Sequence, residues 1–379
     1  MKRIYLDHAA TSPIYPEVAE KMMSMMIESY GNPSSIHSFG REARRILDEA
    51  RRSLAKTIGA KPAEIIFTSG GTEADNLAII GSALANQHKG KHIITTEIEH
   101  HAVLHACKYL EKIGYDITYL PVDKYGMISI EDLTNSLTNQ TVLVTIMYGN
   151  NEVGVIQPIR EIGNILKDHQ AIFHTDAVQA YGIEQIDINE LNVDLLSVSS
   201  HKINGPKGVG FLYAKSGVKL QPTLHGGEQE LKRRAGTENV PGIFGFQLAA
   251  QVSLATQKQK AENYMAFKQE MISIFQQHQL SFEVNSPSDG LPHVFNVYFP
   301  TTNIESLLVN LDLAGIAASS GSACTAGSID PSHVLVAMYG KESDKLLSSV
   351  RFSFGLGTNF EDIQYAANEI VKVVKKVTT

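Results

Sequence analysis

The sequence predicts an α/β protein with a mostly parallel sheet, because strand-like and helix-like segments alternate from about residue 62 onward. Apolar runs such as "EIIFTSG" (64–70) are followed by amphipathic stretches such as "TEADNLAIIGSALAN" (72–86). A chain that repeats this order covers both faces of a parallel sheet with helices. Ligands of such sheets bind at the carboxyl ends of the strands, so a site is expected there.

Each element of this alternating part is expected from its own pattern of apolar residues. The expected strands are 64–70, 92–97, 116–122, 141–149, 171–178, 194–200 and 208–214. The expected helices are 72–86, 100–114, 129–137 and 159–169. A helical stretch then runs from about 240 to 279, apolar at its start and polar on most faces at its end. Such a change indicates that the chain leaves one core for another, and we place a boundary near residue 258.

The remainder of the chain mixes strands with helices and is expected to form an α+β region. The expected strands are "HVFNVYFP" (293–300) and "SVRFSFG" (349–355), and the expected helices are 304–313 and 360–376.

Composition limits the function classes. The chain has 379 residues, 43% of them hydrophobic and 19% charged, which is typical of a folded protein and not of a disordered one. The net charge of −7 argues against a dedicated nucleic-acid binder. There is no signal-peptide pattern in "MKRIYLDHAATSP" and no apolar run of 18 residues. Two cysteines without a CxxC pair indicate a reducing compartment and no zinc cage. We therefore expect a cytoplasmic protein without direct membrane contact.

Two strand ends carry candidate cofactor ligands. In "TSGGTEADN" (68–76), Gly70 and Gly71 let a ligand approach the backbone, and Thr72 is expected to cap the next helix, whose N-terminus suits a phosphate. An ordinary capped turn is the alternative. In "SSHKINGPKG" (199–208), Lys202 directly follows a strand, where an ammonium is costly to bury. A covalent cofactor lysine explains it, and a surface lysine is the alternative, a role that suits Lys207 better.

Two further strand ends complete the pattern. Asp176 in "HTDAVQA" can bind a protonated ring nitrogen or cap a helix, and His100 in "EIEHHAVLHAC" can stack on a flat cofactor or move protons. His101 and His105 share a helix face, but no carboxylate or thiolate set supports a zinc site, so no metal is expected. Cys107 is expected to be a buried structural thiol. Together the four motifs predict a site for pyridoxal 5'-phosphate (PLP).

At this point the sequence resembles the cysteine desulfurases of the NifS/IscS type, a PLP-dependent family with the class-V aminotransferase fold. The resemblance runs from "YLDHAATSP" through "GNPSSIHSFG", "FTSGGTEADNLAI", "EHHAVL", "NNEVGVIQP", "HTDAVQ", "SSHKINGPKGVGFLY" and "HGGEQELKRRAGTEN" to "SSGSACTAGS" and "SSVRFSFG". It implies a type I PLP-dependent transferase fold with a seven-stranded sheet. The implied large domain is 14–258. The small α+β domain is 1–13 with 259–379, and it carries a cysteine loop at about 319–331.

The resemblance also assigns roles to matching positions. It implies that Cys324, Lys202 and His100 are catalytic: Cys324 takes the substrate sulfur, Lys202 binds PLP covalently, and His100 stacks on the ring and assists proton transfer. Arg351 would bind the substrate carboxylate, with Asn151 near both cofactor and substrate. The implied cofactor-binding residues are Gly71, Thr72, His100, Asn151, Asp176, Gln179, Ser199, His201, Lys202 and Thr237.

Within that set the implied contacts differ. Gly71, Thr72, Ser199 and His201 would bind the phosphate, and Asp176 the ring nitrogen. Gln179 would bind the phenolic oxygen. Thr237 would reach the phosphate of a second subunit, which implies a homodimer.

The implied reaction is desulfuration of L-cysteine to L-alanine with a persulfide on Cys324. The segment "SSGSACTAGS" resembles the branch with a long cysteine loop, in which Gly321 and Gly327 would let Cys324 swing to an acceptor. The other branch, with an "RxGHHCA"-like pattern and a link to selenocysteine, is not matched. A selenocysteine lyase or another PLP carbon–sulfur or carbon–selenium lyase remains the alternative. An iron–sulfur scaffold and a tRNA-thiolating enzyme are both expected as sulfur acceptors. Longer members continue past "VVKKVTT" with a scaffold-docking tail, which favours the thiolation partner here.

Overall fold

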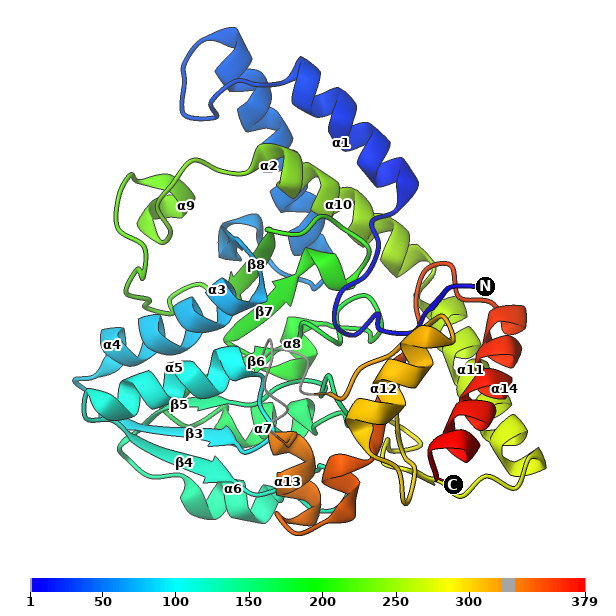
Figure 1. Ribbon diagram of the computed structural model, residues 1–379. Helices are drawn as coiled ribbons and strands as arrows, with labels where there is room; N and C mark the ends of the chain where they lie inside the picture. Colours follow the sequence, from blue (N-terminus) through cyan, green and yellow to red (C-terminus); the bar gives the residue numbers. More distant parts are fainter. Residues whose placement is uncertain (1, 322–330, 379) are drawn as a thin grey trace.

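A seven-stranded sheet forms the centre of the protein in the computed structural model, which describes residues 2–321 and 331–378 (Figure 1). The strands lie in the order β2-β8-β7-β6-β5-β3-β4. All neighbours are parallel except β8, which is antiparallel to β2 and β7. Their bounds are β2 Ile65–Thr68, β3 His92–Thr96, β4 Asp116–Leu120, β5 Thr141–Thr145, β6 Ile172–Asp176, β7 Leu195–Ser199 and β8 Gly210–Ala214. The mostly parallel α/β fold is therefore confirmed.

Helices cover both faces of this sheet because successive side chains of each strand point to opposite faces. In β2, Ile65 and Phe67 belong to one core, and Ile66 belongs to the core on the other face. The first core is closed by α2, α7 and α10, and the second by α3, α4 and α5. The helix bounds in this part are α1 Pro16–Glu28, α2 Ser38–Lys56, α3 Gly71–Asn76, α4 Ser82–Asn86, α5 His101–Lys112, α6 Ile130–Ser136, α7 Ile159–Leu166, α8 Ile188–Leu191, α9 Gln229–Lys232 and α10 Val240–Ala255.

Helix α3 continues into α4 through a wider π-helical turn at Leu77–Gly81, so the expected helix 72–86 is one helical stretch. The observed strands and helices differ from the expected ranges mainly at their ends. The largest difference is in β5, which was expected to reach residue 149 and ends at Thr145.

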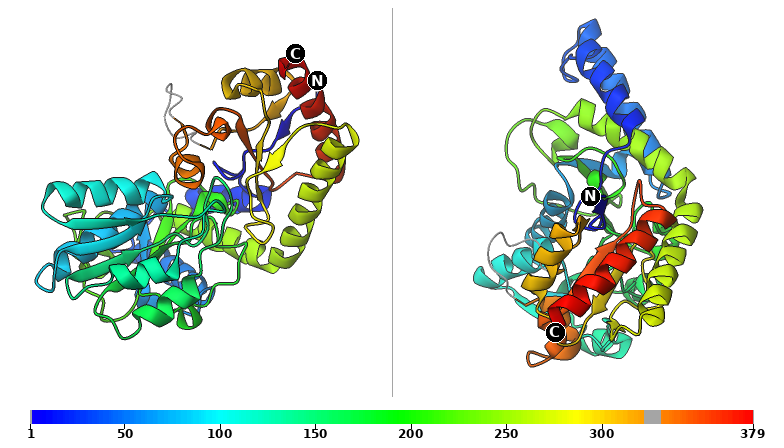
Figure 2. Two further views of the ribbon diagram at one scale, coloured as in Figure 1. Left: turned by 90° about the horizontal axis from the view of Figure 1, so that it is seen from below. Right: turned by 45° about the vertical axis from the view of Figure 1, so that its right-hand side comes forward.

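A smaller body with its own core lies beside the large sheet (Figure 2). Its antiparallel sheet has the order β12-β10-β9, and β1 pairs in parallel with β11. The strands are β1 Ile4–Tyr5, β9 Glu283–Val284, β10 Val294–Tyr298, β11 Ile316–Ala317 and β12 Ser349–Ser353. The helices are α11 Gln257–Gln277, α12 Ile304–Leu313 and α14 Phe360–Thr378. Helix α13 His333–Tyr339 packs instead in a separate small cluster with Ile98 and Met147. Short 3₁₀ turns lie at Pro62–Glu64, Ser200–Lys202 and Asp344–Leu347.

The helical stretch expected over 240–279 is two helices, α10 and α11, which meet at Thr256. Helix α10 contributes Ile243 and Phe246 to the core of the large sheet, whereas α11 contributes Phe267 and Phe275 to the core of the smaller body. The loss of apolar pattern near residue 258 thus has a physical cause. We keep the domain limits 14–258, and 1–13 with 259–379, as a proposal that these separate cores support.

The N-terminal segment connects the two bodies and helps to position the site. The Leu6 N–H donates to the Ala317 carbonyl in the smaller body at 2.9 Å. A few residues later, the Ser12 N–H donates to the His201 carbonyl at 3.1 Å, and the Tyr15 N–H to the Asn204 carbonyl at 2.9 Å. Residues 7–13 therefore run across the turn that follows β7.

Candidate active site

The carboxyl end of the large sheet brings together side chains from four loops. Strand β6 ends at Asp176, β7 ends at Ser199 and is followed within three residues by Lys202, and β3 is followed by Glu99 and His100. Strand β2 runs in the same direction as β7, because both are antiparallel to β8, so Gly70 and Gly71 lie at the same edge. The sequence motifs that were separated along the chain therefore meet where a ligand of an α/β sheet is expected.

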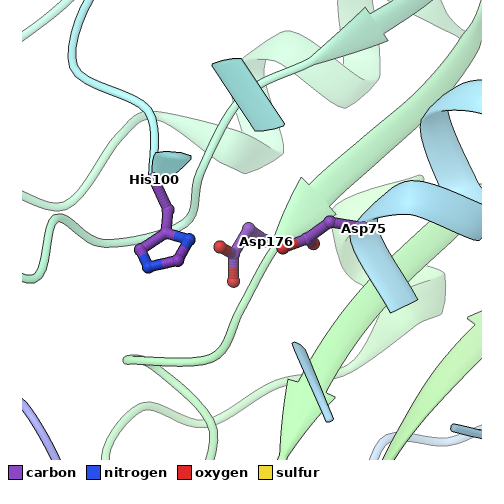
Figure 3. Close-up of side chains that lie close together, drawn as sticks. All are labelled: Asp75, His100 and Asp176. Atoms are coloured by element: carbon purple, nitrogen blue, oxygen red, sulfur yellow. The ribbon is translucent and has the colours of Figure 1, made fainter. Parts of the chain in front are cut away.

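Three buried carboxyl groups form what we call the acidic cluster: Asp75, Glu99 and Asp176. One oxygen each of Asp75 and Asp176 and one ring nitrogen of His100 lie within 4.8 Å of one another, and Asp176 lies between the other two (Figure 3). Burial raises the pKa of Asp176 to about 6, while the Val178 N–H, which donates at 2.9 Å, and the charge of Lys202 oppose the rise.

His100 caps helix α5 and is neutral. The Ala102 N–H donates to its Nδ1 at 3.1 Å, so the proton of the ring is on Nε2. Burial, and then the charge of Lys202, lower the pKa of His100 to about 4. A neutral ring with a defined tautomer can stack on a flat group and donate through Nε2.

Lys202 lies in the 3₁₀ turn after β7 and points to the N-terminal segment. Its Nζ donates to the Ala10 carbonyl at 2.8 Å and also to the Ala9 carbonyl. The same Ala9 carbonyl accepts from Gln179 Nε2 at 3.0 Å, and Gln179 Oε1 lies 3.0 Å from His293 Nε2. The lysine and the glutamine, 23 positions apart, therefore meet at one backbone carbonyl.

The N-terminus of α3 lies next to the end of β7. A Cβ added to Gly70 would lie 3.7 Å from Ser199 Oγ, and one added to Gly71 would lie 2.8 Å from Val178 Cγ2. The expectation that Thr72 caps the helix is wrong, because the helix begins at Gly71 with Gly70 as N-cap and no side-chain cap. The glycines allow close packing here, and the first N–H groups of the helix point out of its end.

His201 and Thr237 were also predicted to bind the phosphate, and they have different surroundings. His201 Nδ1 lies 3.1 Å from Thr11 Oγ1, and burial followed by the charges of two lysines lowers the pKa of His201 to about 4. Thr237 is exposed, three residues after Arg234, which forms an ion pair with Glu73 of α3 at 2.7 Å. Within residues 2–321 and 331–378, Thr237 forms no hydrogen bond to Ser199 or Gly71.

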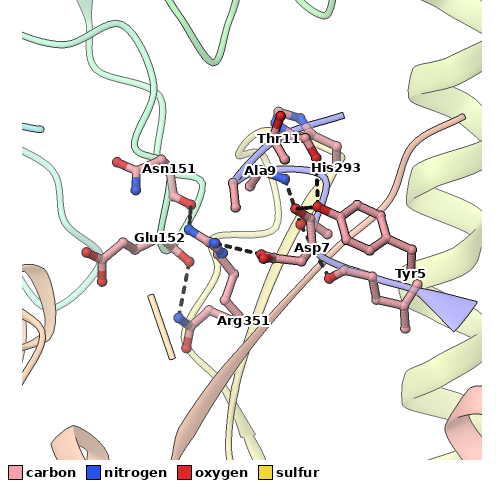
Figure 4. A network of polar contacts seen from close by, with 12 residues as sticks. Tyr5, Asp7, Ala9, Thr11, Asn151, Glu152, His293 and Arg351 are labelled. Carbon is pink, nitrogen blue, oxygen red and sulfur yellow. Dashed lines mark hydrogen bonds and ion pairs between the residues drawn. The ribbon is translucent and has the colours of Figure 1, made fainter. Parts of the chain in front are cut away.

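Arg351 lies opposite, on β12 of the smaller body, in what we call the arginine corner: Arg351, Asp7 and Asn151 (Figure 4). Its side chain is 2% exposed. Its Nη1 donates to the Asn151 carbonyl at 3.0 Å, and its Nη2 forms an ion pair with Asp7 at 2.8 Å. Its Nε has no hydrogen-bond partner in the part of the chain that the structure describes. A buried guanidinium with a donor still unpaired is suited to an anionic ligand.

Of the two cysteines, Cys107 lies among the described residues. Cys324 lies outside the described residues. Cys107 is fully buried in α5, and burial raises the pKa of its thiol to about 12, which confirms the expected burial. Such a thiol stays protonated and unreactive at neutral pH.

The surface beside His100 is hollowed over a volume of about 500 Å³, lined among others by Thr72, Asn76, His101 and His105. The rings of His101 and His105 stack with centroids 5.3 Å apart. Among the described residues, the one trio with ligand atoms close enough for a metal ion is Asp75, His100 and Asp176, so this pair of histidines does not take part in it.

Sequence analysis missed three side chains at this site. Asp75 lies within "TEADN" and Asp7 within "YLDHAATSP", so each was quoted in a motif but received no role. His293, which contacts Gln179, is the first residue of the expected strand "HVFNVYFP" and also received no role. For Asp75, the sequence did contain a signal of a site residue: an acidic residue between apolar positions of a helix.

Comparisons with known proteins agree with this geometry. The sequence pattern described as aminotransferase class-V matches residues 4–366. The chain is 59% identical to a protein named putative cysteine desulfurase IscS 1 of Bacillus subtilis (strain 168), with all of both chains covered. It is 47% identical to a cysteine desulfurase IscS of Dictyoglomus turgidum, covering 100% of this chain and 96% of that one.

Solved structures show the same likeness. A NifS-like protein superposes with a TM-score of 0.92 at 34% identity, covering 99% of this chain and 100% of that chain. A structure titled SspA in complex with cysteine superposes with a TM-score of 0.82 at 37% identity, covering 93% and 99%. The chain belongs to the class-V aminotransferase family of PLP-dependent enzymes.

Proposed function

We propose that this protein is a PLP-dependent cysteine desulfurase, which converts L-cysteine to L-alanine and carries the sulfur as a persulfide on Cys324. One observation carries the proposal: Asp176, Lys202 and His100 converge at the carboxyl end of the sheet, with the buried Arg351 on the neighbouring body. The full-length likeness to proteins named cysteine desulfurase supports the choice of reaction.

The residues at the sheet edge fit PLP. Asp176 is a buried carboxyl group suited to the ring nitrogen, Lys202 is the residue to which the cofactor would attach, and His100 offers a neutral ring for stacking. Asp75 Oδ1 is a buried acceptor without a hydrogen-bond partner among the described residues, so the site is not already satisfied by protein groups.

The rest of the cofactor has matching groups. The N-terminus of α3 at Gly71 and Thr72, with Ser199 and His201, would bind the phosphate. Gln179 would bind the phenolic oxygen, and Asn151 would lie near both cofactor and substrate. When bound, PLP supplies an electron sink that stabilises negative charge on the substrate.

Arg351 would bind and orient the substrate. Its planar guanidinium donates two parallel hydrogen bonds to a carboxylate, and its Nε is unpaired in the described structure. Because Nη2 is held by Asp7 and Nη1 by the Asn151 carbonyl, the guanidinium plane is fixed before substrate binds. Lys202 Nζ would take the proton from the substrate Cα, since it lies at the sheet edge with the cofactor ligands.

Sulfur transfer would use Cys324 as nucleophile. Its thiolate attacks the sulfur of the substrate, a sulfur–sulfur bond forms, and the carbon–sulfur bond breaks. The electron pair stays on the substrate Cβ, which is protonated to give alanine, with His100 Nε2 as the nearby donor. Cysteine and the enzyme thiol thus yield alanine and the enzyme persulfide, without an outside oxidant. The role of Cys324 rests on its motif, since the residue lies outside the described part.

We also propose a homodimer. Helix α1, the start of α2 and the loop between them project from the body of the protein (Figure 1). This segment exposes large apolar side chains. Exposed apolar groups at this density are typical of a protein interface. They are Met23, Met26, Ile27, Tyr30, Ile36 and Phe39. The exposed Thr237 would then reach the phosphate site of the second copy.

The sulfur acceptor would be a protein, either a tRNA-thiolating enzyme or an iron–sulfur scaffold, with no direct nucleic-acid contact. We propose a cytoplasmic location. In the described part of the chain, no helix is long and apolar enough to span a membrane.

The two cysteines supply the test. Purified protein is given L-cysteine and a thiol reductant, and alanine and sulfide are measured together with the absorbance of the bound cofactor. Cys324→Ser is expected to keep the absorbance and lose sulfide release at least 100-fold, whereas Cys107→Ala keeps both. Full activity of Cys324→Ser would contradict the persulfide route. Faster turnover of selenocysteine than of cysteine would favour a selenocysteine lyase instead.

A further inference from the structure

Asp75 is a buried carboxyl group that the proposed reaction does not use. It lies in the second half of α3, is 1% exposed, and has an Oδ1 without a hydrogen-bond partner in the described structure. Burying a carboxylate without a partner is costly, so such a group is neutral or has a function that opposes the cost.

The groups around Asp75 come from four elements. From β6, one carboxyl oxygen of Asp176 lies within 4.8 Å of an oxygen of Asp75 (Figure 3). His174 Nε2, also from β6, lies 3.6 Å from Asp75 Oδ1. His100 stands at the start of α5. Ser197 of β7 and Glu99, which follows β3, act on it as well. The surroundings of Asp75 therefore contain two further carboxyl groups and two imidazoles.

Neither imidazole supplies a positive charge. His174 is hydrogen-bonded at both nitrogens, to Thr145 Oγ1 at 2.8 Å and to Ser197 Oγ at 3.0 Å. Burial lowers its pKa to about 3, and the pKa of His100 is about 4 for the same main reason. Both rings are therefore neutral at pH 7.

The carboxyl groups themselves disfavour an anion at Asp75. Burial raises its pKa well above the ordinary value, the charge of Asp176 raises it further, and Glu99 adds to the rise, while a contact with Ser197 opposes it. Lys202 lowers the pKa of Asp176 and is not among the groups that act on Asp75. The positive charge at this edge of the sheet therefore favours ionised Asp176 over ionised Asp75.

We propose that Asp75 is a positioning residue whose carboxyl group keeps its proton and donates it in a hydrogen bond toward Asp176. Asp176 is then the one anionic carboxylate of the pair and faces the ring nitrogen of the cofactor. A neutral carboxyl group has one O–H to donate, and an oxygen of the Asp176 carboxyl group lies within 4.8 Å of an oxygen of Asp75. This donation stabilises the Asp176 anion, so the proton shared with the cofactor stays on the ring nitrogen. The inference rests on the proposed PLP site but not on which substrate the enzyme uses.

Infrared spectroscopy of the full-length holoenzyme at pH 7 tests the proton directly. The wild type is expected to show a protonated-carboxyl band that Asp75→Asn removes. Glu99→Gln is the matched control: it removes a different buried carboxyl group and leaves the Asp75 band in place. If Asp75→Asn leaves every protonated-carboxyl band unchanged, Asp75 is ionised and the proposal is overturned.

A second measurement tests the proposed hydrogen bond from Asp75 to Asp176. The absorbance of the bound cofactor is titrated with pH in Asp75→Asn and Asp75→Leu. The side-chain amide of Asn can still donate a hydrogen bond, so the pH profile of the Asp75→Asn variant is expected to match that of the wild type. Leu cannot donate, and its profile is expected to shift by about one pH unit. A Leu profile identical to wild type would overturn the proposal. An enzyme inactive on cysteine but showing the Asp75 band and the Leu shift would contradict the proposed function and leave this inference standing.

Discussion

The acidic cluster and the arginine corner are two buried polar groups at one site, and they are built in opposite ways. In the cluster, Asp75 of α3, Glu99 after β3 and Asp176 at the end of β6 meet at one edge of the sheet. The histidines beside them, His100 and His174, are neutral and do not balance a negative charge. In the corner, Arg351 is already paired with Asp7 and with the Asn151 carbonyl. The acidic cluster presents one anionic carboxylate, Asp176, to which a cationic ring would bind. In the arginine corner, two partners fix the Arg351 guanidinium, and its Nε–H has no hydrogen-bond partner among the described residues.

The difference lies in how each is assembled. The acidic cluster depends on local strand–helix turns, and each turn has a recognisable sequence. The arginine corner joins positions that are 344 and 200 residues apart along the chain. Changes of pH are therefore expected to affect the acidic cluster most. Substitutions that change the shape of a side chain are expected to affect the arginine corner most.

The largest effect is expected from Glu99. Burial raises its pKa to about 8, whereas the unfolded chain releases this proton near 4.5. Its neutral form therefore stabilises the fold fully below pH 4.5, and this contribution is lost as the pH rises toward 8, by up to about 1.4 kcal/mol per pH unit. Glu99→Gln is isosteric with the neutral acid and should flatten the stability curve between pH 5 and 8. Urea midpoints across this range measure it, and an unchanged slope would mean that Glu99 is ionised in the fold.

The next largest effect is expected from Arg351→Lys. Lysine keeps the charge but cannot form two parallel bonds to a carboxylate, so about 1.5–3 kcal/mol of binding free energy is lost. The KM for L-cysteine should rise roughly tenfold to a hundredfold, with the absorbance of bound PLP unchanged. The exposed Arg160, changed to Lys, is the control and should leave KM as it is. A loss of cofactor with no change in KM would place Arg351 at the cofactor instead of the substrate.

The smallest effect is expected from Tyr5→Phe. The Tyr5 hydroxyl donates to the carbonyls of Thr11 at 2.9 Å and Asp7 at 3.1 Å, and its side chain is partly exposed. Loss of these bonds should lower the free energy of unfolding by about 0.5–1 kcal/mol and change KM less than about threefold. Tyr125→Phe, at another exposed tyrosine, is the control. A large rise in KM would show that the corner depends on this segment more than its contacts indicate.

Sequence patterns predicted those site residues whose position depends only on their neighbours along the chain. Asp176 stands at the end of an apolar strand, Lys202 follows another closely and His100 begins a helix, and each was found from those neighbours. Ser199 was found only through the family resemblance. Thr72 was wrong as a cap because Gly70 and Gly71 start the helix one residue earlier, and a glycine-rich turn leaves such an end ambiguous. Asp75 was missed because its importance depends on the carboxyl groups beside it, which come from other strands.

By itself the sequence determined the alternation of strands and helices, the parallel sheet and the residues at its carboxyl edge. These follow from apolar periodicity and from the geometry of consecutive strand–helix units. Tertiary structure alone decided that the N-terminal segment crosses to the turn after β7, that α10 and α11 belong to different cores, and that Asp7, Asn151 and Arg351 meet. It also decided that Asp75 lies against Asp176. Contacts between distant segments depend on how whole elements pack, and no local pattern encodes which distant partner each side chain will meet.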